Sequence, residues 1–117
     1  VDDMKQALLS TGFPYDLPTS PRNNINHFID FLYRAQAVRR DGSAAMNLAY
    51  IACGRFDGHW EMKLNPWDMA AGVLLVEEAG GTVSDFKGGS FSIYGDELLA
   101  SNGLLHNRLI EVLREGT

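Results

Sequence analysis

Asp68 stands beside a tryptophan in the segment NPWDMAAG, where a helix is predicted to begin. Asn65 suits the N-cap and Pro66 suits the first helical position, so Asp68 becomes the third residue of that helix. A carboxylate at this position is favoured by about 0.3–1 kcal/mol through the helix dipole, which explains Asp68 without any ligand. The same carboxylate could hold a hard cation, because Mg²⁺ prefers oxygen ligands. Asp68 is therefore a candidate metal ligand if other groups converge on it.

A second candidate is the turn of Gly42, Ser43, Ala44 and Ala45, which opens another predicted helix. Free backbone amides and the positive end of the helix dipole meet at a helix start, and small side chains let an anion approach them closely. A phosphate group suits such a turn. The structural alternative is that Ser43 caps the helix and the alanines allow tight helix packing.

Apolar and polar residues alternate between residues 56 and 64, which predicts a strand with two different sides. Glu61 lies on the polar side and could be a ligand-binding or an ordinary solvated carboxylate, although a parallel strand should be covered on both faces. His59 is expected to be a surface or hydrogen-bonded histidine, because no second His or Cys stands at metal-ligand spacing. Asp96 and Glu97 are expected to form a solvated turn.

The elements that position these residues follow from hydrophobic periodicity, caps and turn residues. Strands that alternate with helices imply crossover connections. The predicted fold is therefore α/β, with a largely parallel or mixed sheet and helices on both faces in a three-layer αβα arrangement. The predicted strands lie at 7–11, 37–39, 56–64, 82–85 and 98–101, and the predicted helices run from 20 to about 37, 42 to 54, 65 to 80 and about 104 to 114.

Length and composition limit the possible functions. With 117 residues, 45% of them hydrophobic and 21% charged, the chain is long enough for one compact domain over residues 1–117 and too short for two. The net charge of −5 and the scattered basic residues argue against nucleic acid or an anionic membrane as a partner. No apolar run is long enough to span a bilayer. We expect a cytoplasmic protein in which Cys53, the single cysteine, is a buried small side chain.

The predicted fold brings the candidate groups together. In a parallel sheet, ligand sites form beyond the carboxyl ends of the strands, where the next helices begin. Asp68, Glu61 and the turn at 42–45 all fall at such junctions, so we expect them to share one crevice. Backbone amides for an anion beside carboxylates for a hard cation suit a phosphate ester and Mg²⁺.

The motifs around these residues are WDMAAG at 67–72, EEAGG at 77–81 and GSAAMNLAYIACGRFDGHWEMKLNP at 42–66. Together they resemble the carboxy-terminal half of the inositol monophosphatase family, which is related to the fructose bisphosphatases and other sugar phosphatases. The likeness runs from STGFPY at 10–15 to the end of the chain. The tryptophan-aspartate signature with its small-residue tail is highly specific.

The resemblance implies a Mg²⁺-dependent phosphomonoesterase that acts on inositol or sugar monophosphates through attack of a metal-activated water. It implies that Asp68 is a metal ligand and that Glu61 accepts a hydrogen bond from an inositol or sugar hydroxyl. Ser43 and Ala44 would present backbone amides near the phosphate, and Gly42 would give the phosphate room. No residue of this chain is assigned as a catalytic acid, base or nucleophile.

The sequence departs from the family pattern in its metal ligands. The family's other ligands come from a Gly-Glu-Glu motif and an Asp-Pro-(Leu/Ile)-Asp-Gly-Thr motif in its amino-terminal half, and the 117 residues contain neither. A two-metal phosphatase needs several carboxylates to hold both ions. We therefore expect the carboxy-terminal half of a two-part phosphatase, inactive alone, that needs an amino-terminal half or a separate chain. Dimers common in the family and the surface that such a half would expose favour a homo-oligomer.

Two other functions stay open at the level of sequence. The chain could be a non-catalytic binding or dimerisation module that retains the phosphatase fold. It could also be a phosphosugar sensor that binds its ligand through Ser43, Ala44 and Glu61 without Mg²⁺.

Overall fold

The computed structural model describes residues 3–11, 25–39, 44–62, 66–92 and 97–115. Apart from a short 3₁₀ helix at the start, the helices and strands in these ranges occur in the order that the sequence predicts. In chain order the elements are η1 (Met4–Gln6), β1 (Leu8–Thr11), α1 (Ile25–Leu32), β2 (Ala37–Arg39), α2 (Ala44–Ala52), β3 (Gly58–Met62), α3 (Pro66–Glu78), β4 (Thr82–Ser84), β5 (Glu97–Ser101) and α4 (His106–Glu115).

The strands form one mixed sheet in the order β2-β1-β3-β5-β4. β1 pairs in parallel with β2 and β3, whereas β5 is antiparallel to β3 and to β4. Parallel neighbours need a crossover connection, which α1 and α2 provide. β5 follows β4 without an intervening helix in the described residues, and an antiparallel pair allows this. The predicted α/β fold with a mixed sheet is confirmed, and its parallel part consists of β2, β1 and β3.

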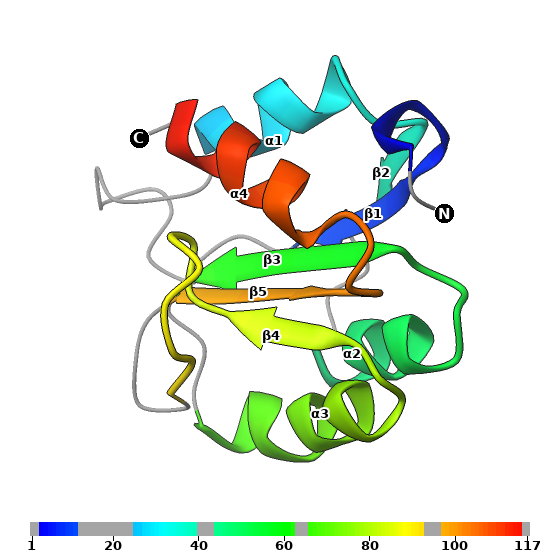
Figure 1. Cartoon of the computed structure of the whole chain (residues 1–117), viewed down its shortest axis with the longest axis vertical. Coiled ribbons are helices and arrows are strands. Elements are labelled where there is room, and N and C mark those ends of the chain that lie inside the picture. The colour runs from blue at the N-terminus through cyan, green and yellow to red at the C-terminus, as the bar shows by residue number, and fades with distance from the viewer. Residues whose placement is uncertain (1–2, 12–24, 40–43, 63–65, 93–96, 116–117) are drawn as a thin grey trace.

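Helices cover both faces of the sheet, as the sequence predicts (Figure 1). α1 and α4 lie on one face, above a core that includes Phe31 and Trp60, whose ring centroids are 4.2 Å apart. α2 and α3 lie on the other face, above a second core that includes Leu48 and Val76. The sheet therefore separates two apolar cores, and the predicted three-layer arrangement is confirmed.

β3 is the central strand, and all of its residues are buried. Its Trp60 and Met62 belong to the core beneath α1 and α4. Alternation along the strand directs His59 and Glu61 to the face that α2 and α3 cover. The predicted division of this strand into two sides is correct, but its polar side is buried because helices cover both faces of the sheet.

Two predictions about exposure are wrong. Cys53 is exposed rather than buried, because it follows the last residue of α2, and its Sγ lies 3.6 Å from the Tyr50 carbonyl oxygen. Glu97 begins β5 instead of lying in a solvated turn, and its Oε1 accepts a 3.1 Å hydrogen bond from the Phe86 amide. Asp96, the other residue of the predicted turn, lies outside the described residues. In both cases the environment at the end of an element depends on tertiary packing, which a local pattern does not contain.

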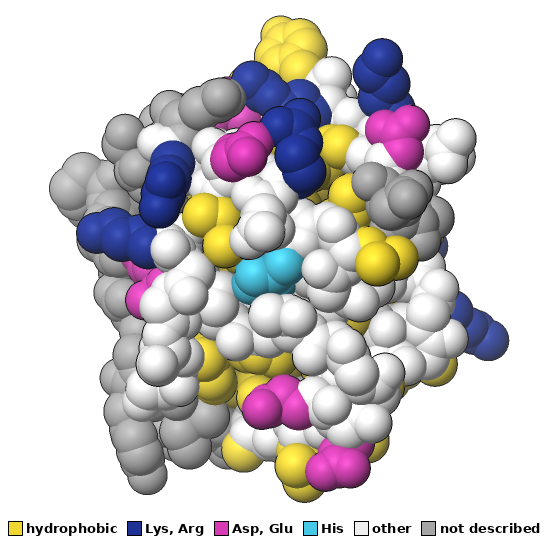
Figure 2. Space-filling view, in the orientation of Figure 1, with side chains coloured by type: hydrophobic (Ala, Val, Ile, Leu, Met, Phe, Trp, Pro, Cys, Tyr) yellow, Lys and Arg dark blue, Asp and Glu magenta, His cyan; other side chains and the backbone are white. Residues whose placement is uncertain are grey.

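Apolar side chains also reach the surface. Leu74 and Leu75 on α3 are at least half exposed, and Figure 2 shows hydrophobic and acidic side chains side by side along the bottom of the molecule, where α3 lies. None of the helices in the described part of the chain is long and apolar enough to cross a membrane.

Close packing of α2 against α3 depends on the absence of a side chain at Gly72. A Cβ atom at Gly72 would lie 2.7 Å from Leu48 Cδ1 and 2.8 Å from Leu48 Cβ, closer than real Cβ contacts. Leu48 is fully buried and has little room to move. Helix packing therefore explains why a small residue is needed at Gly72 in WDMAAG. The same helix, α3, carries Asp68 in its first turn.

Gly72→Ala is expected to lower the free energy of unfolding by about 1–3 kcal/mol, because the added methyl group overpacks the contact between α2 and α3. Urea unfolding followed by circular dichroism measures this change. The expected loss of stability is opposite in sign to the effect of helix propensity, which favours alanine over glycine by about 1 kcal/mol. Ala71→Gly, at an exposed position of the same helix, is the matched control and should show the propensity loss alone. A more stable Gly72→Ala protein would contradict the packing account.

Candidate functional site

The carboxyl ends of β1, β2 and β3 lie at one edge of the sheet because these strands are parallel. Glu61 is the penultimate residue of β3. α2 begins at Ala44, beyond the end of β2, and α3 begins at Pro66, beyond the end of β3. The fold therefore brings the predicted strand-to-helix junctions to the same edge.

The other predicted site residues are placed along the chain as follows. Asp68 is the third residue of α3, as predicted, and its side chain lies outside the described residues. Ala44 is the first residue of α2, and its side chain also lies outside them. Gly42 and Ser43 fall between the described residues 39 and 44. The metal-binding role of Asp68 and the phosphate-binding role of this turn stay predictions.

Glu61 carries a buried carboxylate that is paired within its own strand. The residue is 9% exposed, and its Oε1 lies 3.0 Å from His59 Nε2. The two side chains share a face because they are two residues apart on β3. Such pairing offsets the cost of removing a charged group from water.

His59 connects Glu61 to the neighbouring strand. Its Nδ1 lies 2.8 Å from Ser10 Oγ, and the strand register places Ser10 of β1 opposite His59 of β3. Ser10 and His59 are fully buried. Ser10, His59 and Glu61 therefore form a hydrogen-bonded row, called the polar row below. It crosses from β1 to β3 and ends at the edge of the sheet where α2 and α3 begin.

The chemistry of the polar row determines where the hydrogens lie. An ionised carboxylate only accepts hydrogen bonds, so His59 Nε2 must carry a hydrogen and donate it to Glu61. In the neutral imidazole, Nδ1 is then the acceptor, and the Ser10 hydroxyl donates to it. Every member of the row has a partner in this arrangement.

The polar row contains the residue types of a nucleophilic triad, but Ser10 cannot serve as the nucleophile. Its side chain is fully buried in β1, so a substrate does not reach Oγ. Catalytic triads need a nucleophile that the substrate can contact. At the other end of the row, the Glu61 side chain keeps 12% of its surface exposed.

Sequence reasoning identified Glu61, left His59 as either a surface or a hydrogen-bonded histidine, and missed Ser10. The structure shows the hydrogen-bonded form of His59. The shared side of His59 and Glu61 on an alternating strand is the signal that a sequence can carry. The contribution of Ser10 depends on the register between strands 49 residues apart, which no local pattern contains.

Among the described side chains, no group of three or more His, Cys, Asp or Glu residues could hold a metal ion. The Asp68 side chain lies outside that set. A metal site at this edge would therefore have to include groups beyond the described side chains, and Asp68 is the predicted one.

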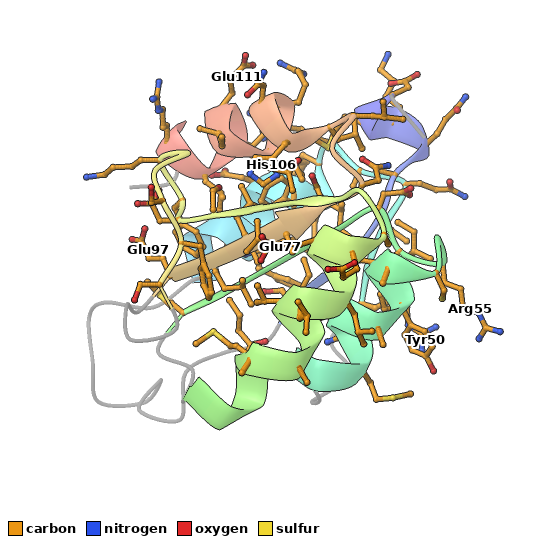
Figure 3. All side chains as sticks on the ribbon, turned by 60° about the horizontal axis from the view of Figure 1, so that its bottom comes forward. Tyr50, Arg55, Glu77, Glu97, His106 and Glu111 are labelled. Carbon is orange, nitrogen blue, oxygen red and sulfur yellow. The ribbon has the colours of Figure 1, made fainter. Side chains whose placement is uncertain are left out.

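A pocket of about 490 Å³ is lined by residues of β1, β2 and α2 and of the segment after α2, among them Tyr50 and Arg55. Figure 3 shows Tyr50 and Arg55 at the opposite end of the molecule from Glu97. Glu97 pairs with Met62, the last residue of β3, so it marks the edge where Glu61 lies. The lining also includes Arg39, the last residue of β2, and Met46 and Asn47 in the first turn of α2, so the pocket extends from that end of the molecule to the start of α2.

Comparison with known proteins identifies the family. The sequence model described as the inositol monophosphatase family matches residues 1–117. The chain belongs to the inositol monophosphatase family. Membership in the family and the fold that the sequence predicts are therefore confirmed, and the likeness to its carboxy-terminal half stays a prediction.

Relatives within the inositol monophosphatase family include proteins with two kinds of name. The inositol-1-monophosphatase of Synechocystis sp. is 44% identical over 110 residues, covering 94% of this chain and 38% of that protein. The Nus factor SuhB of Escherichia coli is 41% identical over 113 residues, covering 97% of this chain and 42% of that protein. The structure of inositol monophosphatase from Anabaena (Nostoc) sp. superposes with a TM-score of 0.96 at 43% identity, covering 98% of this chain and 46% of that one. The chain spans 31–42% of the length of the curated relatives that it matches.

This inositol monophosphatase family member holds a second buried histidine, His106, at the start of α4. Its Nε2 lies 2.7 Å from Ser84 Oγ on β4, and its Nδ1 lies 2.8 Å from Ser101 Oγ on β5. Figure 3 shows His106 between α4 and the sheet. Burial lowers the pKa of His106 below its ordinary value of 6.5. His106 therefore joins α4 to two strands in its neutral form.

The hydroxyl partners of His106 also favour the neutral ring. Ser84 Oγ donates to the Asp85 carbonyl oxygen, so it accepts from His106 Nε2. Ser101 Oγ accepts from the Gly103 amide, so its hydrogen is available to His106 Nδ1. Protonation of Nδ1 would require the Ser101 hydroxyl to turn its hydrogen away and accept a second hydrogen bond.

The lowered pKa of His106 predicts that stability falls on acidification below about pH 6.5. In that window the unfolded state binds more protons than the folded state, so the free energy of unfolding decreases by up to about 1.4 kcal/mol per pH unit. The stability that neutral His106 contributes is fully present above the pKa of this histidine in the unfolded state. It is lost as the pH falls towards the lower pKa of His106 in the folded state. Denaturant unfolding of the wild type and of His106→Gln between about pH 7.5 and 5.5 measures it. The stability difference between the two proteins should shrink on acidification, and parallel pH profiles would contradict this account.

Proposed function

We propose that this chain is part of a Mg²⁺-dependent phosphomonoesterase that hydrolyses inositol or sugar monophosphates. The observation that carries the proposal is the position of Glu61, a buried carboxylate held by His59 at the edge where α2 and α3 begin. Family membership, with a relative named inositol-1-monophosphatase at 44% identity, supports the reaction class.

Each predicted site residue has a distinct part in the proposal. Glu61 would accept a hydrogen bond from a hydroxyl group of the substrate. Ser43 and Ala44 would donate backbone amides to phosphate oxygens at the start of α2, and Gly42 would let the phosphate approach them. Asp68 would be a metal ligand in the first turn of α3, where the helix dipole also stabilises it.

The donor set explains why the chain alone would be incomplete. Mg²⁺ demands near-octahedral oxygen coordination, and Asp68 is the one carboxylate that the proposal places on the metal. Bound Mg²⁺ would supply an activated water and neutralise charge on the phosphate. We propose that the chain corresponds to the carboxy-terminal half of a two-part phosphatase and that the remaining ligands belong to an amino-terminal half. The chain spans 31–42% of the length of the curated relatives that it matches, which supports a protein in two parts, whereas the carboxy-terminal assignment rests on the motifs of the sequence.

The proposal includes self-association and a cytoplasmic location. Ile29, Leu32 and Tyr33, in and just after α1, are 44%, 51% and 85% exposed. Apolar side chains exposed together favour a surface that another protein surface covers. The exposed, unpaired Cys53 suits a reducing compartment.

The name of one relative favours a second candidate function. The Escherichia coli protein is called a Nus factor rather than a phosphatase. By analogy, the chain could be a non-catalytic binding or dimerisation module that retains the phosphatase fold. Asp68→Asn would then leave its biological effect intact, whereas the enzyme proposal requires a loss.

The isolated chain is expected to release no phosphate from inositol 1-phosphate, because it supplies too few metal ligands. We expect it to gain Mg²⁺-dependent turnover when joined to the part of the Anabaena protein that lies outside the match; this fusion is called the joined protein below. Asp68→Asn should then lower kcat/KM at least about a hundredfold, since a lost metal ligand removes several kcal/mol of transition-state stabilisation. Colorimetric phosphate release measures both effects.

Glu77→Gln is the matched control for Asp68→Asn. Glu77 lies exposed near the other end of α3 (Figure 3), so the same loss of an acidic group there should leave turnover unchanged. Mg²⁺-dependent turnover by the isolated chain would refute the two-part proposal. A folded joined protein without turnover would favour the non-catalytic module.

A further inference from the structure

We propose that His59 is a positioning residue for Glu61 and fixes the direction in which this carboxylate meets a substrate hydroxyl. The inference rests on the proposed function, because it gives His59 a part in the same substrate site. It concerns how the site distinguishes a polyol phosphate from a phosphate ester without hydroxyl groups.

Within the polar row, one of the two carboxylate oxygens of Glu61 is available to bind a ligand. Oε1 is occupied by His59 Nε2 at 3.0 Å. No hydrogen bond from the described residues reaches Oε2, and the Glu61 side chain keeps 12% of its surface exposed. Oε2 is therefore the oxygen that a ligand at the sheet edge can use.

His59 is itself held from its other side. Ser10 Oγ lies 2.8 Å from Nδ1, and the His59 side chain has no exposed surface. Hydrogen bonds at both ring nitrogens determine the plane of the ring as well as its position. Strand register places Ser10 opposite His59, so the direction of the Glu61 carboxylate follows from the pairing of β1 with β3.

A fixed carboxylate binds a hydroxyl group at a lower entropic cost than a mobile one. Ordering a glutamate side chain on binding costs free energy that a preorganised side chain does not lose. Because the polar row sets the rotamer of Glu61 in advance, Oε2 is ready to accept a hydrogen bond from a ring hydroxyl. His59 contributes to the recognition of polyol phosphates in this way and takes no direct part in phosphoryl transfer.

The test compares His59→Met with His59→Gln in the joined protein. Methionine and glutamine have nearly the same shape, but glutamine alone can donate a hydrogen bond to Glu61. KM and kcat are measured for inositol 1-phosphate and for cyclohexyl phosphate, which has the same ring without hydroxyl groups. His59→Met should raise KM for inositol 1-phosphate about tenfold to a hundredfold with kcat nearly unchanged, because a hydrogen bond to a charged group is worth roughly that factor. Cyclohexyl phosphate should be hydrolysed as before, and His59→Gln should recover most of the loss.

Two further variants serve as controls. His106→Met makes the same substitution at a buried histidine that also bonds two serines but lies at the start of α4. It should lower stability without a selective effect on inositol 1-phosphate. Glu61→Gln should reproduce the selective rise in KM, and adding His59→Met to it should cause little further loss, because the two residues act as one unit.

The outcomes separate this inference from the proposed function. Equal losses for both phosphate esters, or additive effects of His59→Met and Glu61→Gln, would overturn the positioning role and leave the proposed function standing. A wild-type joined protein without turnover on either ester would refute the proposed function and, with it, the role of His59. Should His59→Met fail to fold, Ser10→Ala removes the hydrogen bond at Nδ1 and should give a smaller rise in KM with the same selectivity.

Discussion

Burial of β3 on both faces is the constraint on which the rest of the structure depends. A central strand between two layers of helices leaves no water for its polar side chains, so His59 and Glu61 must find partners inside the sheet. β1 supplies one of them in Ser10. The resulting polar row ends at the sheet edge with a carboxylate oxygen still able to accept a hydrogen bond. The packing that completes the core therefore also orients a group at the place where two helices begin.

The two helices that begin at this edge serve both the core and the proposed site. Gly72 lets α3 lie close to Leu48 of α2, so the packing of the pair determines how closely the two helices lie together. Asp68 stands in the first turn of α3, where the helix dipole stabilises a carboxylate whether or not a metal is bound. A structural reason and a functional reason for Asp68 are therefore compatible, and family membership favours the second.

Local patterns predicted the order of the elements and the two sides of β3, because caps, turns and periodicity are properties of short segments. They did not predict that β5 runs antiparallel between β3 and β4, since strand order depends on contacts between distant segments. The same limit applies at the site. Glu61 was selected from its place at a strand end, whereas the partnership of Ser10 with His59 depends on the register between two strands.

A crystal structure of the joined protein with Mn²⁺ and inorganic phosphate tests the central claim most directly, because anomalous scattering locates the ion without assumptions about its ligands. The account predicts the Asp68 carboxylate on the Mn²⁺ ion, the phosphate oxygens on the amides of Ser43 and Ala44, and Glu61 Oε2 facing the same crevice. An Asp68 side chain directed away from the Ser43 turn, with no room for an ion between them, would contradict the account.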